Sequence, residues 1–205
     1  MRLLFFILSI IASLTSSAQV FQTGLLAGIG ATQIEGDGYG GYDKIGFIVG
    51  GFVNTDISKK LATQFEIYFI NKGSFNALQP DKGDFDSFKA NINYIEVPVA
   101  LQYHQQQFTF EAGLYLAKII GTPSLSDENG EIFIIQFPFK PFDFGGFLGI
   151  SYHLNEHLIF NLRSKNSIIP IRDMPSFDNG ILSRLFKNGW YNVDLNFSVR
   201  YSFGK

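Results

Sequence analysis

The sequence predicts an all-β protein, an eight-stranded antiparallel transmembrane β-barrel of the up-and-down type with short periplasmic turns and long outer loops. Two observations predict this fold. Apolar and polar residues alternate along several segments, as in strands that have one apolar and one polar face. Short and long connections also alternate along the chain, as they do in outer-membrane barrels. The length of 205 residues corresponds to a single domain.

Residues 1–18 have the pattern of a cleaved signal peptide. Arg2 gives the segment a positive start, Leu3–Leu14 is almost wholly apolar, and small residues lead up to Ala18. The apolar run has about a dozen residues, whereas a membrane-spanning helix needs roughly 20. We therefore expect export, cleavage after Ala18, and a barrel domain over residues 19–205.

The composition fits strands with two different faces and excludes several functional classes. Charged residues make up 17% of the chain, against roughly 25% in an average soluble domain, yet the mean hydropathy is only +0.11. A chain with few charges and no long apolar block after the signal suits alternating strands. The net charge of −2 provides no basic surface for nucleic acid, and the absence of cysteine excludes disulfides, thiolate metal sites and a cysteine nucleophile.

Seven segments between residues 21 and 163 alternate apolar and polar residues with the period of two that is typical of a strand. The first of them is rich in glycine. In chain order these segments are Phe21–Gln33, Lys44–Asn54, Leu61–Ile70, Ile95–His104, Phe108–Leu116, Phe142–His153 and Leu158–Arg163.

The C-terminal segment has the strictest alternation. From Tyr191 to Phe203 every odd-numbered residue is apolar or aromatic, and every even-numbered residue from Asn192 to Ser202 is polar. Thirteen residues that rise about 3.3 Å each and tilt by some 40° cross roughly 33 Å, which suits a bilayer. Strands of soluble sandwiches are usually shorter, about 5–6 residues.

The connections between these strands alternate in length. The short ones are Thr55–Lys60, His104–Gln107 and Leu154–His157. The long ones are Ile34–Asp43, Ser74–Lys89, Gly121–Lys140 and Asn166–Gly189. This order places both termini on the periplasmic side, with the long connections outside.

Several motifs, in the same order, resemble the PorT-like outer-membrane β-barrel family that is common in Bacteroidetes. They are Gly24–Gly30, Lys44–Phe52, Phe65–Gly73, Tyr94–Pro98 and Asp143–Gly149. The chain departs from the family pattern at Leu162–Asn166, where a more basic strand is usual. The resemblance implies an outer-membrane barrel in the cell envelope. It implies little about function, because only the namesake branch is tied to protein secretion.

The end of the chain also resembles known outer-membrane proteins. Asn196–Phe203 fits the C-terminal strand that barrel-assembly machinery recognises, with Ser198 where glycine is usual. We therefore expect two partners, the outer-membrane lipid and the assembly machinery during insertion.

The polar faces of the strands predict a network of charges inside the barrel. An eight-stranded barrel has a lumen that side chains fill, and buried charges need partners. We therefore expect four acids and four bases to pair as a structural plug: Lys44, Glu66, Lys72, Glu96, Glu111, Asp143, Arg163 and Arg200. A narrow ion or proton path through the same residues is the alternative, whereas a general diffusion porin does not fit eight strands.

Aromatic residues near the ends of the last strand suit the two interfacial girdles of a membrane barrel. We expect Trp190, Tyr191, Tyr201 and Phe203 to occupy these positions. In the long loops, Asn76–Phe88 is rich in aspartate, and Ile132–Phe139 is too apolar for a freely solvated loop. The second segment is expected to extend the wall, cover the mouth or contact a partner.

No motif predicts a catalytic centre, a metal site or a cofactor. His104, His153 and His157 all fall near short turns, away from the outer rim, and the chain has no Gly-x-Ser-x-Gly elbow. His153 and His157 lack a third ligand at suitable spacing, so we expect turn histidines rather than zinc ligands.

We therefore predict a non-enzymatic outer-membrane protein that has a structural role or binds a partner or ligand through its outer loops. Secretion or envelope assembly is the role implied by the family resemblance. Two alternatives remain open at this point. One is a soluble periplasmic lipocalin-like barrel that encloses a small apolar ligand, and the other is a small outer-membrane barrel enzyme.

Overall fold

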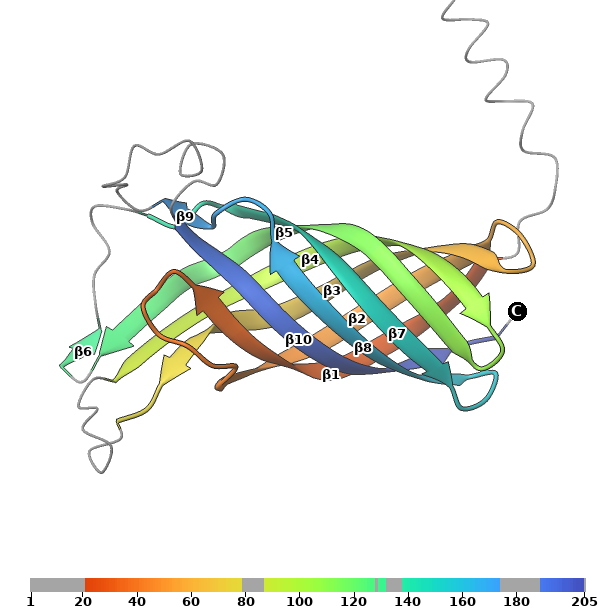
Figure 1. The fold of residues 1–205 in the computed structure, drawn as a ribbon, viewed down its shortest axis with the longest axis horizontal. Coiled ribbons are helices and arrows are strands. Elements are labelled where there is room, and N and C mark those ends of the chain that lie inside the picture. Colours follow the sequence, from red (N-terminus) through yellow and green to blue (C-terminus); the bar gives the residue numbers. More distant parts are fainter. Residues whose placement is uncertain (1–20, 79–86, 128, 132–137, 174–188, 205) are drawn as a thin grey trace, which may run out of the picture.

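The computed structural model describes residues 21–78, 87–127, 129–131, 138–173 and 189–204 (Figure 1). The predicted signal peptide therefore lies outside the described residues. Within the described part of the chain, no helix has the length and apolar character needed to span a membrane.

Eight long antiparallel strands close into a ring, as predicted. They are β1 (Phe21–Glu35), β2 (Lys44–Asp56), β3 (Leu61–Asn76), β4 (Phe88–Gln105), β5 (Phe108–Asp127), β7 (Phe142–His153), β8 (Leu158–Ser167) and β10 (Gly189–Ser202). Each strand pairs with its neighbours in sequence, and β1 pairs with β10 from Gly24↔Ser202 to Glu35↔Tyr191. The two-residue strands β6 (Gly130–Glu131) and β9 (Arg172–Asp173) pair antiparallel with the loop-end parts of β5 and β10.

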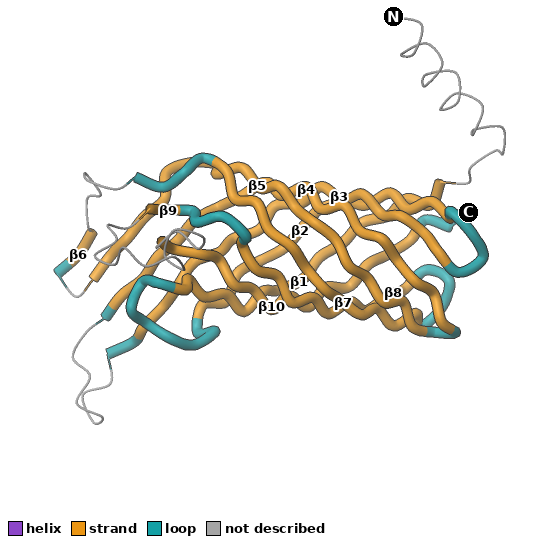
Figure 2. Tube along the Cα trace, turned by 45° about the horizontal axis from the view of Figure 1, so that its top comes forward, coloured by secondary structure: helices purple, strands orange, loops and turns teal. Residues whose placement is uncertain are grey.

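The barrel has two different ends. Tight turns join β2 to β3, β4 to β5 and β7 to β8, and both ends of the described chain lie beside them (Figures 1 and 2). The first turn is closed by the Ile57 amide, which donates to the Leu61 carbonyl at 2.8 Å, and the third by a 3.0 Å bond from Leu154 to Leu158. We call this end the turn end and the opposite one the loop end.

The strands reach further toward the loop end than the alternation predicts. β3 continues to Asn76, β4 begins at Phe88 and β5 continues to Asp127, so parts of the expected loops Ser74–Lys89 and Gly121–Lys140 are strand. Figure 1 shows β4 and β5 reaching furthest from the turns. The expected boundaries were wrong because the outer faces of these tips carry polar residues, whereas apolar residues such as Ala90 and Ile92 point inward there. Cross-strand bonds among asparagines replace apolar contacts there, for example Asn71 to Asn91 at 2.9 Å and to Asn93 at 2.6 Å.

Apolar side chains cover the outside of the wall, and polar ones fill the inside. Phe47 and Leu148 are 69% and 68% exposed, whereas Glu96, Asp143 and Lys72 are fully buried. A soluble barrel that encloses an apolar ligand would have the opposite arrangement, so the structure does not favour that alternative.

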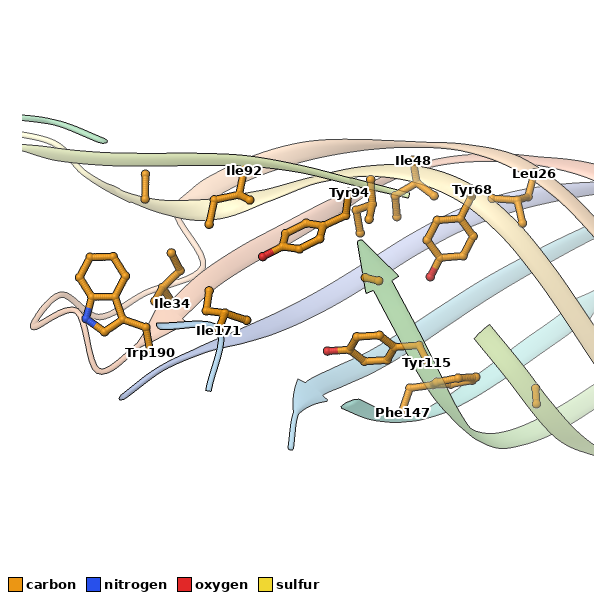
Figure 3. Packing of buried hydrophobic residues seen from close by; sticks show 14 of the residues in the cluster. Leu26, Ile34, Ile48, Tyr68, Ile92, Tyr94, Tyr115, Phe147, Ile171 and Trp190 are labelled. Carbon is orange, nitrogen blue, oxygen red and sulfur yellow. The ribbon is translucent and has the colours of Figure 1, made fainter. Parts of the chain in front are cut away.

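Trp190 contradicts the expectation of an interfacial girdle position. It is only 6% exposed, because even-numbered residues of β10 point inward and Trp190 shares this parity with Asn192 and Asp194. Figure 3 shows Trp190 with Ile34 and Ile171, and Tyr115 beside Phe147 deeper in the barrel. These residues belong to a cluster of apolar and aromatic side chains inside the wall.

Two adjacent glycines on β7 provide a test of this inside-outside arrangement. A methyl group on Gly145 would overlap the Tyr115 ring and the Asn166 carbonyl, whereas one on Gly146 would meet nothing closer than 3.7 Å. We expect Gly145→Ala to lower the free energy of unfolding by about 1–3 kcal/mol through overpacking. Gly146→Ala should change it by at most about 0.5 kcal/mol. Both free energies are measured by urea titration, with the folded fraction read from the compact, heat-modifiable gel band that unheated folded barrel gives. Equal effects of the two substitutions would contradict the packing.

Candidate functional site

Nine of the buried charged side chains in the lumen pair with one another, in two groups contributed by six strands. The group nearer the turn end, which we call the arginine cluster, consists of Glu66, Glu111, Arg163 and Arg200. The group nearer the loop end, which we call the lysine cluster, consists of Lys72, Glu96, Asp143, Lys165 and Asp194. Their side chains are at most 4% exposed, so they are almost fully removed from solvent.

The arginine cluster is a neutral quartet held across the lumen. Arg163 on β8 binds Glu66 on β3 through two 2.7 Å hydrogen bonds, and its Nε donates to Glu111 on β5 at 2.5 Å. Arg200 on β10 lies 3.2 Å from Glu66 and 3.4 Å from Glu111. Each carboxylate thus faces both arginines. Bidentate geometry of this kind is specific to the planar guanidinium group.

The lysine cluster has more carboxylates than cations. Lys72 lies 3.0 Å from Glu96, 3.3 Å from Asp143 and 3.0 Å from Asp194. Lys165 pairs with Glu96 as well. Neutral donors stabilise Asp143 further, since Ser167 donates to it at 2.7 Å.

Tyrosine side chains enclose the two ammonium groups of the lysine cluster. Lys72 Nζ lies 4.6 Å from the centre of the Tyr115 ring, and Lys165 Nζ lies 4.4 Å from the centre of the same ring. The Tyr68 hydroxyl donates to Glu96 at 2.5 Å. Cation–π contacts of desolvated ammonium groups add about 2 kcal/mol each, so the aromatic wall stabilises charges that would be costly here otherwise.

The structure brings together seven of the eight charged residues expected in the lumen. Lys44 is the exception, because it points into the lumen nearer the loop end and bonds to Asn71 rather than to a carboxylate. Two members of the lysine cluster, Lys165 and Asp194, were missed. The alternation along the strand would have found them, because residues separated by an even number point to the same side. Lys165 follows Arg163 by two residues, and Asp194 precedes Arg200 by six.

Aromatic side chains gather inside the loop end, above the lysine cluster. Tyr39 stacks on Phe88 at 4.9 Å, and Trp190 meets Phe88 and Phe139 edge-on at 6.2 and 5.8 Å. The Arg172 guanidinium lies over the Trp190 ring at 4.5 Å. We call these five residues the aromatic cap.

The loop 36–43 beside the cap is ordered by Asp37, which accepts the Tyr39 amide hydrogen at 2.9 Å. Burial raises the pKa of the Asp37 carboxyl above its ordinary value. In the apolar segment Ile132–Phe139, residues 132–137 lie outside the described part, and Phe139 packs against the buried cluster.

The remaining aromatic residues of the expected girdle lie on the outer side of β10. Tyr201 and Phe203 are 50% and 58% exposed at the turn end, and their ring centres are 6.0 Å apart. Tyr191 is partly exposed near the loop end. These three residues therefore occupy the two ends of the wall, whereas Trp190 belongs to the cap.

The three histidines lie at the turn end. His104 and His153 both bond to the Thr109 hydroxyl, at 2.8 Å each, and His157 bonds to the Ser202 carbonyl through Nδ1 at 2.9 Å. The described residues contain no group of three or more His, Asp or Glu side chains placed to hold a metal ion.

The model of the outer membrane protein beta-barrel domain family matches residues 15–173, which is most of the chain. The chain belongs to this family. It is therefore an outer-membrane β-barrel protein, as the apolar outer wall indicates. A search of curated proteins finds no match.

Three solved outer-membrane proteins are similar in structure. Neisserial surface protein A has 13% identity over 88% of this chain and 97% of its own, with a TM-score of 0.56. Ail, the attachment invasion locus protein of Yersinia pestis, crystallised with the heparin analogue sucrose octasulfate, has 10% identity over 89% and 99%, with a TM-score of 0.45. OprG from Pseudomonas aeruginosa has 15% identity over 90% and 95%, with a TM-score of 0.40. The likeness to the neisserial protein shows a shared fold.

The arginine cluster makes a clear prediction about stability. Arg163→Met leaves the two carboxylates Glu66 and Glu111 with only Arg200 as a cationic partner in the cluster, so we expect the free energy of unfolding to fall by about 3–5 kcal/mol. The matched control is Lys140→Met, which removes an ion pair with Asp173 whose side chains are 31% and 55% exposed. That change should cost at most about 1 kcal/mol. Urea titration in the same detergent compares them, and a similar small loss for both would contradict the buried network.

Proposed function

We propose that this protein is a non-enzymatic barrel that has a structural or interaction role at its loop end, in secretion or envelope assembly. The loop end faces outward and the turn end faces the periplasm in this proposal. The observation that carries it is the paired, solvent-free charge network, which fills the lumen across its width and leaves the ends of the barrel for contact with other molecules.

The filled lumen argues against transport and against catalysis within the barrel. Each charged side chain of the two clusters is engaged by an opposite charge, and a substrate would have to displace these pairs at a high energetic cost. A diffusion channel would need polar side chains that leave a continuous water-filled path, which eight strands do not provide when their inward side chains are this large.

The loop end has the features of an interaction surface. β3, β4 and β5 project there, and they carry large apolar side chains that solvent reaches. Phe75 is 38% and Leu78 is 49% exposed, and Tyr42 in the neighbouring loop is 46% exposed. Apolar side chains that project beyond a barrel wall are typical of sites that contact another protein.

The motif order supports the link to secretion or envelope assembly. Lys44–Phe52, Phe65–Gly73 and Tyr94–Pro98 resemble the PorT-like family, whose namesake branch is tied to protein secretion. The last strand, which fits the signal for barrel-assembly machinery, supports insertion by that route, with outer-membrane lipid around the apolar wall.

Site-specific photo-cross-linking in the native envelope tests this proposal. A photoreactive amino acid at Tyr42 or Leu78 should form a protein adduct of one defined size. The matched control positions are Lys59 and Asn155 in the turns, which should not form that adduct. Adducts from the turn positions alone, or no adduct from either loop-end position in cells that contain the protein at its natural level, would contradict a role at the loop end.

A further inference from the structure

The turn end of the lumen contains a cavity that the side chains of the arginine and lysine clusters do not fill. Its volume is about 990 Å³, within the range of small-molecule sites. Arg200, Gln64 and Gln102 form its inner end, where they contact the glutamates of the arginine cluster. The cavity is therefore a blind pocket that ends at the quartet and opens between the turns.

The charges on the cavity wall balance. Lys59 and Arg200 are the cations, and Asp56 and Glu156 are the anions. The charge of Arg200 is in addition shared with two glutamates of the neutral quartet. The wall therefore has no excess of either charge to hold an ion, and the pocket suits an uncharged ligand.

Two histidines on the wall offer one hydrogen-bond donor and one acceptor. Thr109 Oγ1 lies 2.8 Å from His104 Nδ1 and 2.8 Å from His153 Nε2. The hydroxyl can donate its single hydrogen to one ring while it accepts the N–H of the other ring. In neutral imidazoles the remaining nitrogens then have opposite roles. One of His104 Nε2 and His153 Nδ1 is a donor, and the other is an acceptor.

Polar groups of Asn54 and Arg200 near the cavity also include both an acceptor and a donor. Both hydrogens of the Asn54 amide are taken, by Gln102 at 2.5 Å and Gln64 at 3.3 Å, which leaves the Asn54 carbonyl oxygen as an acceptor. Arg200 Nε is a donor, and it is buried with no hydrogen-bond partner among the described residues. The Arg200 side chain is only 2% exposed, so this unsatisfied N–H lies behind the inner end of the cavity.

The wall also has an apolar part, formed by Phe52 and Ile159. A ligand for this pocket must be uncharged, must both donate and accept hydrogen bonds, and must offer C–H surface to aromatic rings. Sugars have this combination, since every hydroxyl both donates and accepts and the ring faces carry C–H groups. We propose that the turn-end cavity binds a short neutral oligosaccharide, which in the orientation proposed above would be a periplasmic glycan.

Ligand-observed saturation-transfer NMR on the folded full chain tests this inference. The protein should be held in a detergent without a sugar headgroup, so that detergent does not compete for the cavity. The probes are cellobiose and N,N′-diacetylchitobiose, with unacetylated chitobiose as a cationic analogue, glucose 6-phosphate as an anionic one and N-acetyl-trialanine amide as a neutral peptide. We expect saturation transfer to the two neutral disaccharides and little to the other three.

Two neighbouring substitutions on β10 locate the site. Ser202 lines the cavity and is 4% exposed, whereas Tyr201 faces outward and is 50% exposed. Ser202→Trp should fill the cavity and weaken disaccharide binding at least tenfold, and Tyr201→Trp should leave it unchanged. If Ser202→Trp does not give the heat-modifiable band, His153→Gln replaces it and should weaken binding about fivefold.

The inference is overturned if neither disaccharide receives saturation, because the cavity then holds only water. It is also overturned if Ser202→Trp or His153→Gln binds as well as the parent, or if a charged analogue or the peptide binds more tightly. The experiment uses purified protein and is independent of orientation and of any loop-end partner. Its failure therefore leaves the proposed function standing, and failure of the cross-linking test leaves this site standing.

Discussion

The apolar solvent around the wall is the constraint on which the rest of this structure depends. A bilayer accepts a β-sheet only when the sheet is closed and its outer face is apolar, and strand geometry then sends every second side chain inward. In a ring of eight strands the inward side chains fill the space. Charges on that face cannot be hydrated, so they must be paired. The arginine and lysine clusters are the result, and residues as far apart in sequence as Glu66 and Arg163 meet across the lumen.

The same constraint explains why the two ends of the barrel differ. At the loop end, Trp190, Phe88 and their neighbours cover the lysine cluster with aromatic surface. At the turn end, smaller polar side chains such as Ser151 and Ser202 leave a cavity below the quartet. A filled middle, a capped loop end and an open turn end separate two surfaces that can act independently. The proposed interaction role belongs to the first and the proposed sugar site to the second.

The sequence predicted the ring because an alternation with a period of two residues shows which face of a strand is apolar. In a membrane barrel the outer face contacts lipid and the inner face does not, so the two faces differ strongly in polarity. The sequence predicted most of the lumen charges for the same reason, as Glu96 and Arg163 show. The sequence-based prediction failed where a side chain was placed by its residue type, or was left out, instead of being placed by its odd or even position in the strand. Trp190 was expected outside because it is aromatic, although its parity is that of Asn192, and Lys165 was overlooked in a strand with weak alternation.

The strand tips and the contacts across the lumen are harder to predict. Beyond the membrane the outer face need not be apolar, so Asn71 and Asn91 occupy outward positions that are apolar further down the wall, although they lie in paired strands. Which acid meets which base depends on the register between strands and on their tilt around the ring. Neither quantity is recorded in the composition of a single strand, so the quartet geometry required the structure.

The most direct test of a dry, charge-paired lumen inside an apolar wall is thiol labelling of single cysteines along β10. The chain has no cysteine of its own, so each position can be examined alone. In folded protein, Leu195→Cys and Phe197→Cys should react with a membrane-soluble maleimide. Ser198→Cys, on the lumen side and nearly isosteric, should react with neither a membrane-soluble nor a water-soluble maleimide until the protein is heated. Rapid reaction of Ser198→Cys with the water-soluble reagent would contradict the account, because the lumen would then be open to water.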